Sequence, residues 1–161
     1  MRVDAHHHVW DPAVRDLPWT HGSPVLHRTC TADDLRPALL RNAIDATVVV
    51  QTGAVAQETA ELLARAARDP HTRAVVGWAD LTDPAVGDRL AALREGPGGR
   101  ALVGLRQPAT DEADPDWPAR SDIRAHCARS PTCCCRPWGR TASCTARTGR
   151  CACRRPGTTK C

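Results

Sequence analysis

Two histidines separated by one residue, His6 and His8, lie near the start of the chain, where they end the short segment Arg2–Ala5. Side chains alternate between the two faces of a β-strand, so these imidazoles should share one face while His7 points to the other. Two imidazoles on one face can bind the same divalent metal ion, and zinc accepts such ligands readily. The pattern predicts a metal site at His6 and His8, with a packing or solvent-exposed role for His7.

A bound zinc ion would lower the pKa of a coordinated water toward about 7 and polarise a carbonyl, which is the chemistry of hydrolysis at neutral pH. The alternative interpretations are a remnant of an affinity tag and incidental histidines. A tag is disfavoured because Val3-Asp4-Ala5 and Val9-Trp10-Asp11 frame only three consecutive histidines. The His-x-His pattern supports a metal site because it lies at the end of the first apolar strand.

Strands and helices alternate after this motif. The pattern predicts strands over 2–6, 44–51, 73–81 and 101–107, and helices that begin at Thr31, after Thr52-Gly53 and at Asp83-Pro84. Strands that alternate with helices of this length indicate βαβ units and a parallel sheet. A closed (β/α)₈ barrel needs about 250 residues, so the predicted fold class is α/β, the N-terminal half of a TIM barrel with about four βα units. The carboxyl ends of barrel strands form the active-site floor, where His6 and His8 would lie.

Local signals support two of these helices. Thr31 is a suitable N-cap residue with Asp34 three positions later, and Leu35, Leu39 and Leu40 form an apolar stripe at helical spacing. Asp83 is expected to cap the third helix, with Pro84 at its first position.

The composition changes abruptly near residue 123. All 18 acidic residues lie in 1–123 with 13 of the 22 basic residues, a balance of −5, whereas 124–161 has a balance of +9. The segment 124–161 contains eight of the nine cysteines and no Val, Leu, Ile, Met, Phe or Tyr. Such a composition cannot build a core. The expected organisation is a partial barrel over 1–123 and a Cys/Arg-rich tail over 124–161 without a confident fold.

Several classes of function are excluded by these patterns. No apolar run reaches the length of a membrane span, and the N-terminus lacks the zones of a signal peptide, which favours a cytoplasmic protein. An odd number of cysteines, nine, disfavours a disulfide framework there. The net charge of +4 is the sum of an acidic segment over 1–123 and a basic segment over 124–161, so it does not indicate a specific nucleic-acid surface.

Four blocks then resemble a known family. They are Asp4-Ala5-His6-His7-His8-Val9-Trp10-Asp11, Val49-Val50-Gln51, Gly77-Trp78-Ala79-Asp80-Leu81, and Gly104-Leu105-Arg106-Gln107 with the following Asp111–Trp117. In this order they resemble the amidohydrolase-related (amidohydrolase 2) family of the amidohydrolase superfamily, in particular its sugar-lactone and dicarboxylate lactonase branch. The resemblance covers the N-terminal half of such an enzyme.

The resemblance implies a distorted TIM barrel that opens lactone rings, with His6 and His8 as metal ligands or their substrate-binding equivalents. Members differ in their dependence on metal. Arg106 matches a position that holds a substrate carboxylate or carbonyl, for which the fork of a guanidinium is suited, although an ion pair at the strand end would explain it equally well without the resemblance. Gln107 and Trp78 are expected to contact the substrate beside it.

Other polar residues receive less specific expectations. Gln51 and Asp80 lie at strand ends as further pocket candidates, and His21 and His27 are expected to be exposed in the long loop from Val9 to Cys30. Asp111–Trp117 is expected to be a turn-rich loop over the barrel mouth without a catalytic role.

Two later segments of the family have no counterpart in this sequence. These are an Asp-His-x-x-Lys-Pro type segment, and a Ser-Asp-Trp-Pro type segment whose aspartate is the usual general base. No catalytic residue is therefore assigned to this chain, and its status as an active enzyme is left open. The similarity fades at the composition break, which we interpret as a shifted reading frame after Ile123. The rival interpretation of the tail is a genuine metal- or partner-binding appendage.

The leading functional hypothesis is a metal-assisted hydrolase of a small lactone or related ester, in a truncated form. One alternative is a metal-dependent decarboxylase of the same family. The other is an inactive half-barrel with a metal- or partner-binding tail. The expected partner is a small lactone or carboxylated substrate, without a membrane or specific nucleic acid, and open barrel edges would favour self-association.

Overall fold

The computed structural model describes residues 1–108, 113–114, 116 and 120–121. In this part of the chain, strands and helices alternate as β1 (Val3–His7), α1 (Ala32–Arg41), β2 (Ala46–Val50), α2 (Ala56–Ala66), β3 (Thr72–Gly77), α3 (Val86–Glu95) and β4 (Leu102–Leu105), with short 3₁₀ helices at Pro18–Thr20 and Gly99–Ala101. The predicted tail over 124–161, and most of the expected loop Asp111–Trp117, lie outside the described residues.

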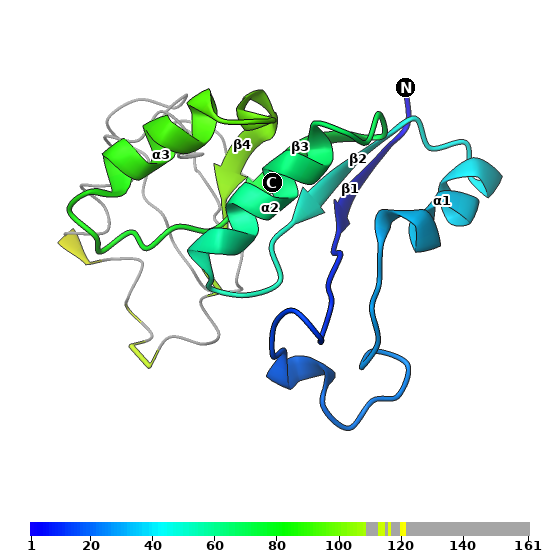
Figure 1. Cartoon of the computed structure of the whole chain (residues 1–161), viewed down its shortest axis with the longest axis horizontal. Coiled ribbons are helices and arrows are strands. Elements are labelled where there is room, and N and C mark those ends of the chain that lie inside the picture. Colours follow the sequence, from blue (N-terminus) through cyan, green and yellow to red (C-terminus); the bar gives the residue numbers. More distant parts are fainter. Residues whose placement is uncertain (109–112, 115, 117–119, 122–161) are drawn as a thin grey trace, which may run out of the picture.

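The four strands form one parallel sheet in the order β1-β2-β3-β4 (Figure 1). Each strand pairs with its predecessor in the chain, so the order does not reverse as it does in a doubly wound fold. This sequential order is that of a barrel segment and confirms the predicted βαβ architecture. Because all strands run in the same direction, their carboxyl ends lie along one edge of the sheet.

Helices α2 and α3 cover one face of the sheet and form the core with it. Val49, Val75 and Leu102 lie side by side on β2, β3 and β4, and each is at most 3% exposed. Leucines of the two helices pack against them, namely Leu62, Leu63 and Leu90. The near-continuous Val run of β2 matches a strand that is covered on both faces. This packing fixes the direction in which the strand ends point.

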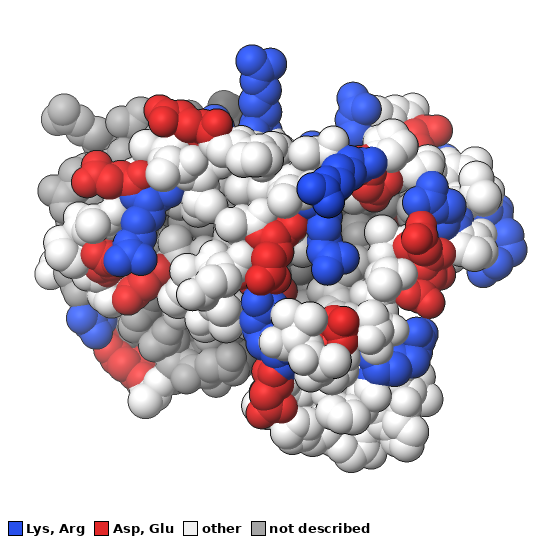
Figure 2. Space-filling model, viewed as in Figure 1, with Lys and Arg blue, Asp and Glu red and all other residues white. Residues whose placement is uncertain are grey.

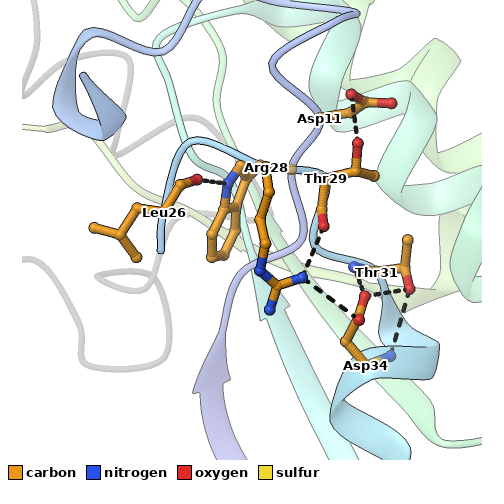
Figure 3. Close-up of polar contacts among 7 residues, drawn as sticks. Asp11, Leu26, Arg28, Thr29, Thr31 and Asp34 are labelled. Carbon is orange, nitrogen blue, oxygen red and sulfur yellow. Dashed lines mark hydrogen bonds and ion pairs between the residues drawn. The ribbon is translucent and has the colours of Figure 1, made fainter. Parts of the chain in front are cut away.

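The first helix begins as the sequence predicts. The Thr31 hydroxyl accepts a hydrogen bond from the Asp34 backbone N–H, and the Asp34 carboxylate accepts one from the Thr31 N–H, which makes a capping box (Figure 3). The hydrogen bonds that the Asp34 carboxylate accepts from the Thr31 N–H and from the Thr31 hydroxyl lower the pKa of Asp34. The predicted apolar stripe is only partly correct: Leu39 is buried, but Leu40 is 70% exposed because it lies a further 100° around the helix.

The end of the third strand and the start of the third helix are among the boundaries that differ from the prediction. The third strand ends at Gly77 rather than at residue 81, because the Trp78 N–H donates to the Thr59 hydroxyl of α2 and no longer to a strand. Helix α3 begins at Val86, after Ala85, and not at Asp83. Asp83 instead closes a turn, in which its carboxylate accepts from the Ala85 N–H. The predicted cap at Asp83 is wrong, because the helix is preceded by Ala85, two residues later.

The long segment between β1 and α1 is closed at its base. Trp10 and Cys30 exchange two backbone hydrogen bonds, with N–O distances of 2.9 and 2.8 Å. Between them, Leu17 and Thr20 are buried, and the Trp10 and Trp19 rings meet edge to face. The Thr29 hydroxyl also donates to the Asp11 carboxylate across the base (Figure 3). We call residues 10–30 the first loop.

Acidic and basic side chains are interspersed over the face of the molecule in Figure 2. That view displays no single-signed patch of the kind that would attract nucleic acid. None of the helices among the described residues is both long and apolar enough to span a membrane.

Candidate functional site

The two histidines of the predicted metal site converge at the carboxyl end of β1. Their Nε2 atoms lie 3.1 Å apart, with the rings nearly perpendicular. The His8 Nδ1–H donates to the Val50 carbonyl oxygen at the end of β2, at 2.8 Å. A carbonyl only accepts, so Nδ1 of His8 carries the proton, and the unprotonated Nε2 of His8 accepts a hydrogen bond from the His6 Nε2–H. His6 is exposed and His8 is half-buried, so the pair can be reached from solvent.

His6 is also biased toward its neutral form. Partial burial lowers the pKa of His6 below its ordinary value of 6.5, and the charges of His8 and Arg106 lower it further, while Asp4 acts in the opposite direction. A metal ion binds only the neutral imidazole. The environment therefore keeps His6 ready to act as a ligand at neutral pH.

The spacing of the two imidazoles fits a zinc ion. Zinc–nitrogen bonds of about 2.0–2.1 Å at a tetrahedral angle place two ligand nitrogens about 3.3 Å apart. The 3.1 Å between the Nε2 atoms is close to this value. Within the described residues, no group of three or more His, Cys, Asp or Glu side chains comes together to hold a metal. The pair thus supplies two ligands of a site whose other positions these residues do not fill.

His7 points to the opposite face of the sheet. It is half-buried beside Thr47 and Leu39, in a small cavity under α1. Burial lowers its pKa. This placement agrees with the packing role expected from strand alternation.

The residues expected to contact substrate follow β3 and β4. The Arg106 backbone N–H donates to the Gly77 carbonyl at 2.8 Å, which brings its exposed side chain to the same edge of the sheet as the histidine pair. The Trp78 indole N–H donates to the Gln107 side-chain oxygen at 2.6 Å. Arg106 is close enough to His6 for its charge to affect that imidazole, so β1 and β4 contribute to one region.

The remaining polar candidates separate into different environments. Gln51 is fully buried at the end of β2. Asp80 is exposed, and its carboxylate accepts from the Thr82 N–H and hydroxyl, which lowers its pKa. Asp80 therefore shapes a local turn. His21 and His27 are exposed in the first loop as expected, where they pair with Asp16 and Thr20.

Two residues that shape this edge have no assigned site role in the sequence prediction. The buried Glu58 carboxylate accepts from the Thr52 N–H and hydroxyl and from the Gly53 N–H, which fixes the turn after β2. The Thr59 hydroxyl accepts from the Trp78 N–H and donates to the Trp78 carbonyl, both at 2.8 Å. An acidic residue in the first helical turn after Thr-Gly is the signal that could have identified Glu58.

Comparison with known proteins adds independent information. No family model matches the sequence. The chain is 39% identical over 115 residues to an L-fucono-1,5-lactonase from Burkholderia multivorans, which covers 71% of this chain and 38% of the relative. The chain thus spans well under half the length of the curated relative it matches.

Solved structures give the same result. An amidohydrolase from Burkholderia multivorans in complex with HEPES is 36% identical to this chain and matches its fold with a TM-score of 0.72. The match covers 80% of this chain and 44% of the amidohydrolase. The structure of the same kind of protein with bound zinc gives a TM-score of 0.71 with the same identity and coverage. The four parallel strands and their helices correspond to half of a TIM barrel.

Proposed function

This chain belongs to a lactonase-like family of the amidohydrolase superfamily and corresponds to the N-terminal part of its members, and we propose that it carries the first half of a lactone-hydrolysing site. The observation that supports this proposal is the convergence of the His6 and His8 Nε2 atoms, 3.1 Å apart, at the strand edge to which Arg106 also contributes. The curated relatives named L-fucono-1,5-lactonase favour a sugar lactone over the carboxylated aromatic acid of a decarboxylase. The proposed substrate class is a 1,5-lactone of a sugar acid.

His6 and His8 would hold a divalent metal, with zinc favoured by the imidazole ligands and by the zinc-bound solved relative. When bound, zinc would polarise the lactone carbonyl and make a coordinated water more acidic. The Val50 carbonyl keeps the His8 ring in place through its Nδ1–H. This contact would orient the ligand before metal arrives.

Arg106, Trp78 and Gln107 would bind the lactone. The Arg106 guanidinium offers paired N–H donors to a carbonyl or ring oxygen, and its charge would stabilise oxygen that becomes negative when the ring opens. The hydrogen bond from Trp78 to the Gln107 side chain fixes both groups beside it. Catalytic turnover would also require a general base, the aspartate of a Ser-Asp-Trp-Pro type segment. To Arg106, Trp78 and Gln107 themselves we therefore assign only the binding of the lactone.

Zinc binding tests the proposal most directly. With its cysteines blocked by alkylation, so that thiolates do not compete, the full chain is expected to bind zinc in isothermal titration calorimetry. His8→Ala should weaken this binding by at least about tenfold, since one of two protein ligands is lost. His21→Ala is the matched control, because His21 is an exposed histidine of the first loop. Equal zinc affinity in wild type, His8→Ala and His21→Ala would exclude this site.

Hydrolysis of L-fucono-1,5-lactone in the presence of zinc is then measured by the release of acid. Activity that depends on both His8 and Arg106 would support the lactonase assignment. Zinc binding at His6 and His8 without any hydrolysis would show that these residues form only the binding half of the site.

The sheet edges support a second proposal, self-association. Among the described residues, β1 pairs only with β2 and β4 pairs only with β3, so each outer strand has an unpaired edge. The partner we propose is a second copy of this chain, because its β1 and β4 present the complementary parallel edges.

A further inference from the structure

The side chain at the end of β2 joins two strands that are not neighbours. The Gln51 amide Nε2–H donates to the Arg106 carbonyl oxygen, which follows β4, at 2.9 Å. Adjacent strands lie about 4.8 Å apart, so this side chain bridges twice that spacing past the end of β3. The Gln51 backbone N–H also donates to Val76 of β3. Gln51 therefore links the carboxyl ends of three strands.

Core packing does not account for a glutamine at this position. Gln51 is fully buried, and its Oε1 atom has no hydrogen-bond partner within the described part of the chain. Burial of an amide with an unpaired acceptor is unfavourable, and an apolar side chain of similar size would avoid this cost. What the glutamine provides and an apolar residue cannot provide is the N–H donated to the Arg106 carbonyl.

Val50 and Gln51, which are adjacent in the chain, each form a hydrogen bond with one residue of the candidate site, Val50 with His8 and Gln51 with Arg106. The Val50 carbonyl accepts from the imidazole of His8, which follows β1, and the Gln51 side chain donates to the carbonyl of Arg106, which follows β4. The backbone of Arg106 is held a second time, by its N–H to the Gly77 carbonyl. With both its N–H and its carbonyl bound, the peptide planes of Arg106 are fixed, and the direction of its side chain is restricted.

We propose that Gln51 is a positioning residue that fixes the Arg106 backbone and thereby directs the guanidinium toward the His6–His8 pair. This inference rests on the proposed function for its role in lactone binding, because Arg106 is the group expected to hold the lactone. Gln51 itself contacts neither the metal nor the lactone in this scheme.

The test compares Gln51→Met with Thr47→Val in the full chain. Methionine keeps the length of the side chain and removes the donor. Thr47→Val removes another buried polar group of β2, whose hydroxyl donates to the His71 carbonyl at the opposite end of the strand. Gln51→Asn is a second variant that keeps the amide but is one methylene too short to reach β4.

The first readout is independent of activity. The rate at which phenylglyoxal modifies Arg106, measured by peptide mass mapping, is expected to change several-fold in Gln51→Met and Gln51→Asn, with Arg15 and Arg36 unchanged. Thr47→Val should leave the Arg106 rate as in wild type. A general loss of structure would instead change all three arginines together. An unchanged Arg106 rate in folded Gln51→Met or Gln51→Asn would overturn the proposal.

The second readout separates this proposal from the lactonase assignment. With L-fucono-1,5-lactone, loss of positioning should raise KM about tenfold in Gln51→Met, the effect of one hydrogen bond, while zinc affinity stays at the wild-type value. A wild-type KM in that variant would also overturn the positioning role. If wild type shows no hydrolysis while the Arg106 modification rate still responds to Gln51, the proposed function fails and the positioning of Arg106 stands.

Discussion

His6 and His8 share a face of the sheet but are held by different means. His8 is half-buried and fixed by the Val50 carbonyl, whereas His6 is exposed and meets the His8 ring edge to face. The state of His6 is therefore set mainly by partial burial and by the charges around it, among which Arg106 is the cation from β4. Such a group should respond measurably to removal of that cation.

We expect His6 of the zinc-free protein to titrate below 6.5, its ordinary pKa. Arg106→Ala should raise the pKa of His6, because a neighbouring positive charge disfavours the imidazolium. Zinc binding needs the neutral ring, so it should be lost at a higher pH in this variant. The measurement is the NMR titration of the His6 ring protons. Arg100→Ala, at the amino end of β4, is the control, and identical shifts in both variants would contradict the assignment.

The sequence predicted the shared face of His6 and His8 because strand alternation is a local rule. The family resemblance suggested Arg106 and Gln107, and Trp78 was suggested by its place near a strand end. The bond between Gln51 and Arg106 joins residues 55 positions apart, and the orphaned Gln51 oxygen depends on burial. Neither property is encoded in a local pattern, so the sequence could offer Gln51 only as a polar strand terminus.

At the level of the elements, β3 and α2 are in unusually close contact. A Cβ atom built on Gly77 would lie 2.4 Å from the Thr59 methyl carbon and 2.7 Å from its hydroxyl oxygen. The absence of a side chain at Gly77 thus lets Thr59 reach the Trp78 backbone, where it ends the strand. The third strand was predicted too long because this contact is tertiary, while the apolar character of the sequence continues to Leu81.

Gly77→Ala should therefore destabilise the protein by about 1–3 kcal/mol, the usual cost of overpacking. Gly87→Ala is the matched control: a Cβ there meets nothing within 4 Å, and Gly87 lies in helix α3. It should stabilise the fold by about 0.5–1 kcal/mol. Urea unfolding measures both effects. In the double variant Gly77→Ala/Thr59→Ala the losses should be less than additive, and full additivity would show that the two residues do not clash.

For the molecule as a whole, the open edges of β1 and β4 determine how it should behave in solution. We expect wild type to self-associate with increasing concentration in sedimentation velocity. Val103→Lys should weaken this association, because Val103 is 56% exposed on β4 and a lysine on an edge strand opposes further pairing. Val14→Lys, at a 67% exposed position of the first loop, should not. A monomer at all concentrations would refute the proposed association.

The composition break after residue 123 leads to a prediction about the gene. If the reading frame is shifted there, the coding DNA downstream of Ile123 should encode Asp-His-x-x-Lys-Pro and Ser-Asp-Trp-Pro type segments in one of the other frames. Sequencing that region checks this directly. Their absence from both frames would remove the frameshift interpretation and leave the Cys/Arg-rich tail as a genuine segment.

The backbone bridge between Trp10 and Cys30 makes the first loop replaceable by another loop with the same two ends. Its two ends are held at strand-pairing distance, and Leu17 and Thr20 are buried within it, so residues 11–29 form a loop that closes on its own base. Ion pairs join it to two helices, Arg15 with Glu61 of α2 and Arg28 with Asp34 of α1. A loop of different length could therefore be grafted between Trp10 and Cys30 without altering β1, which precedes it, or α1, which follows it.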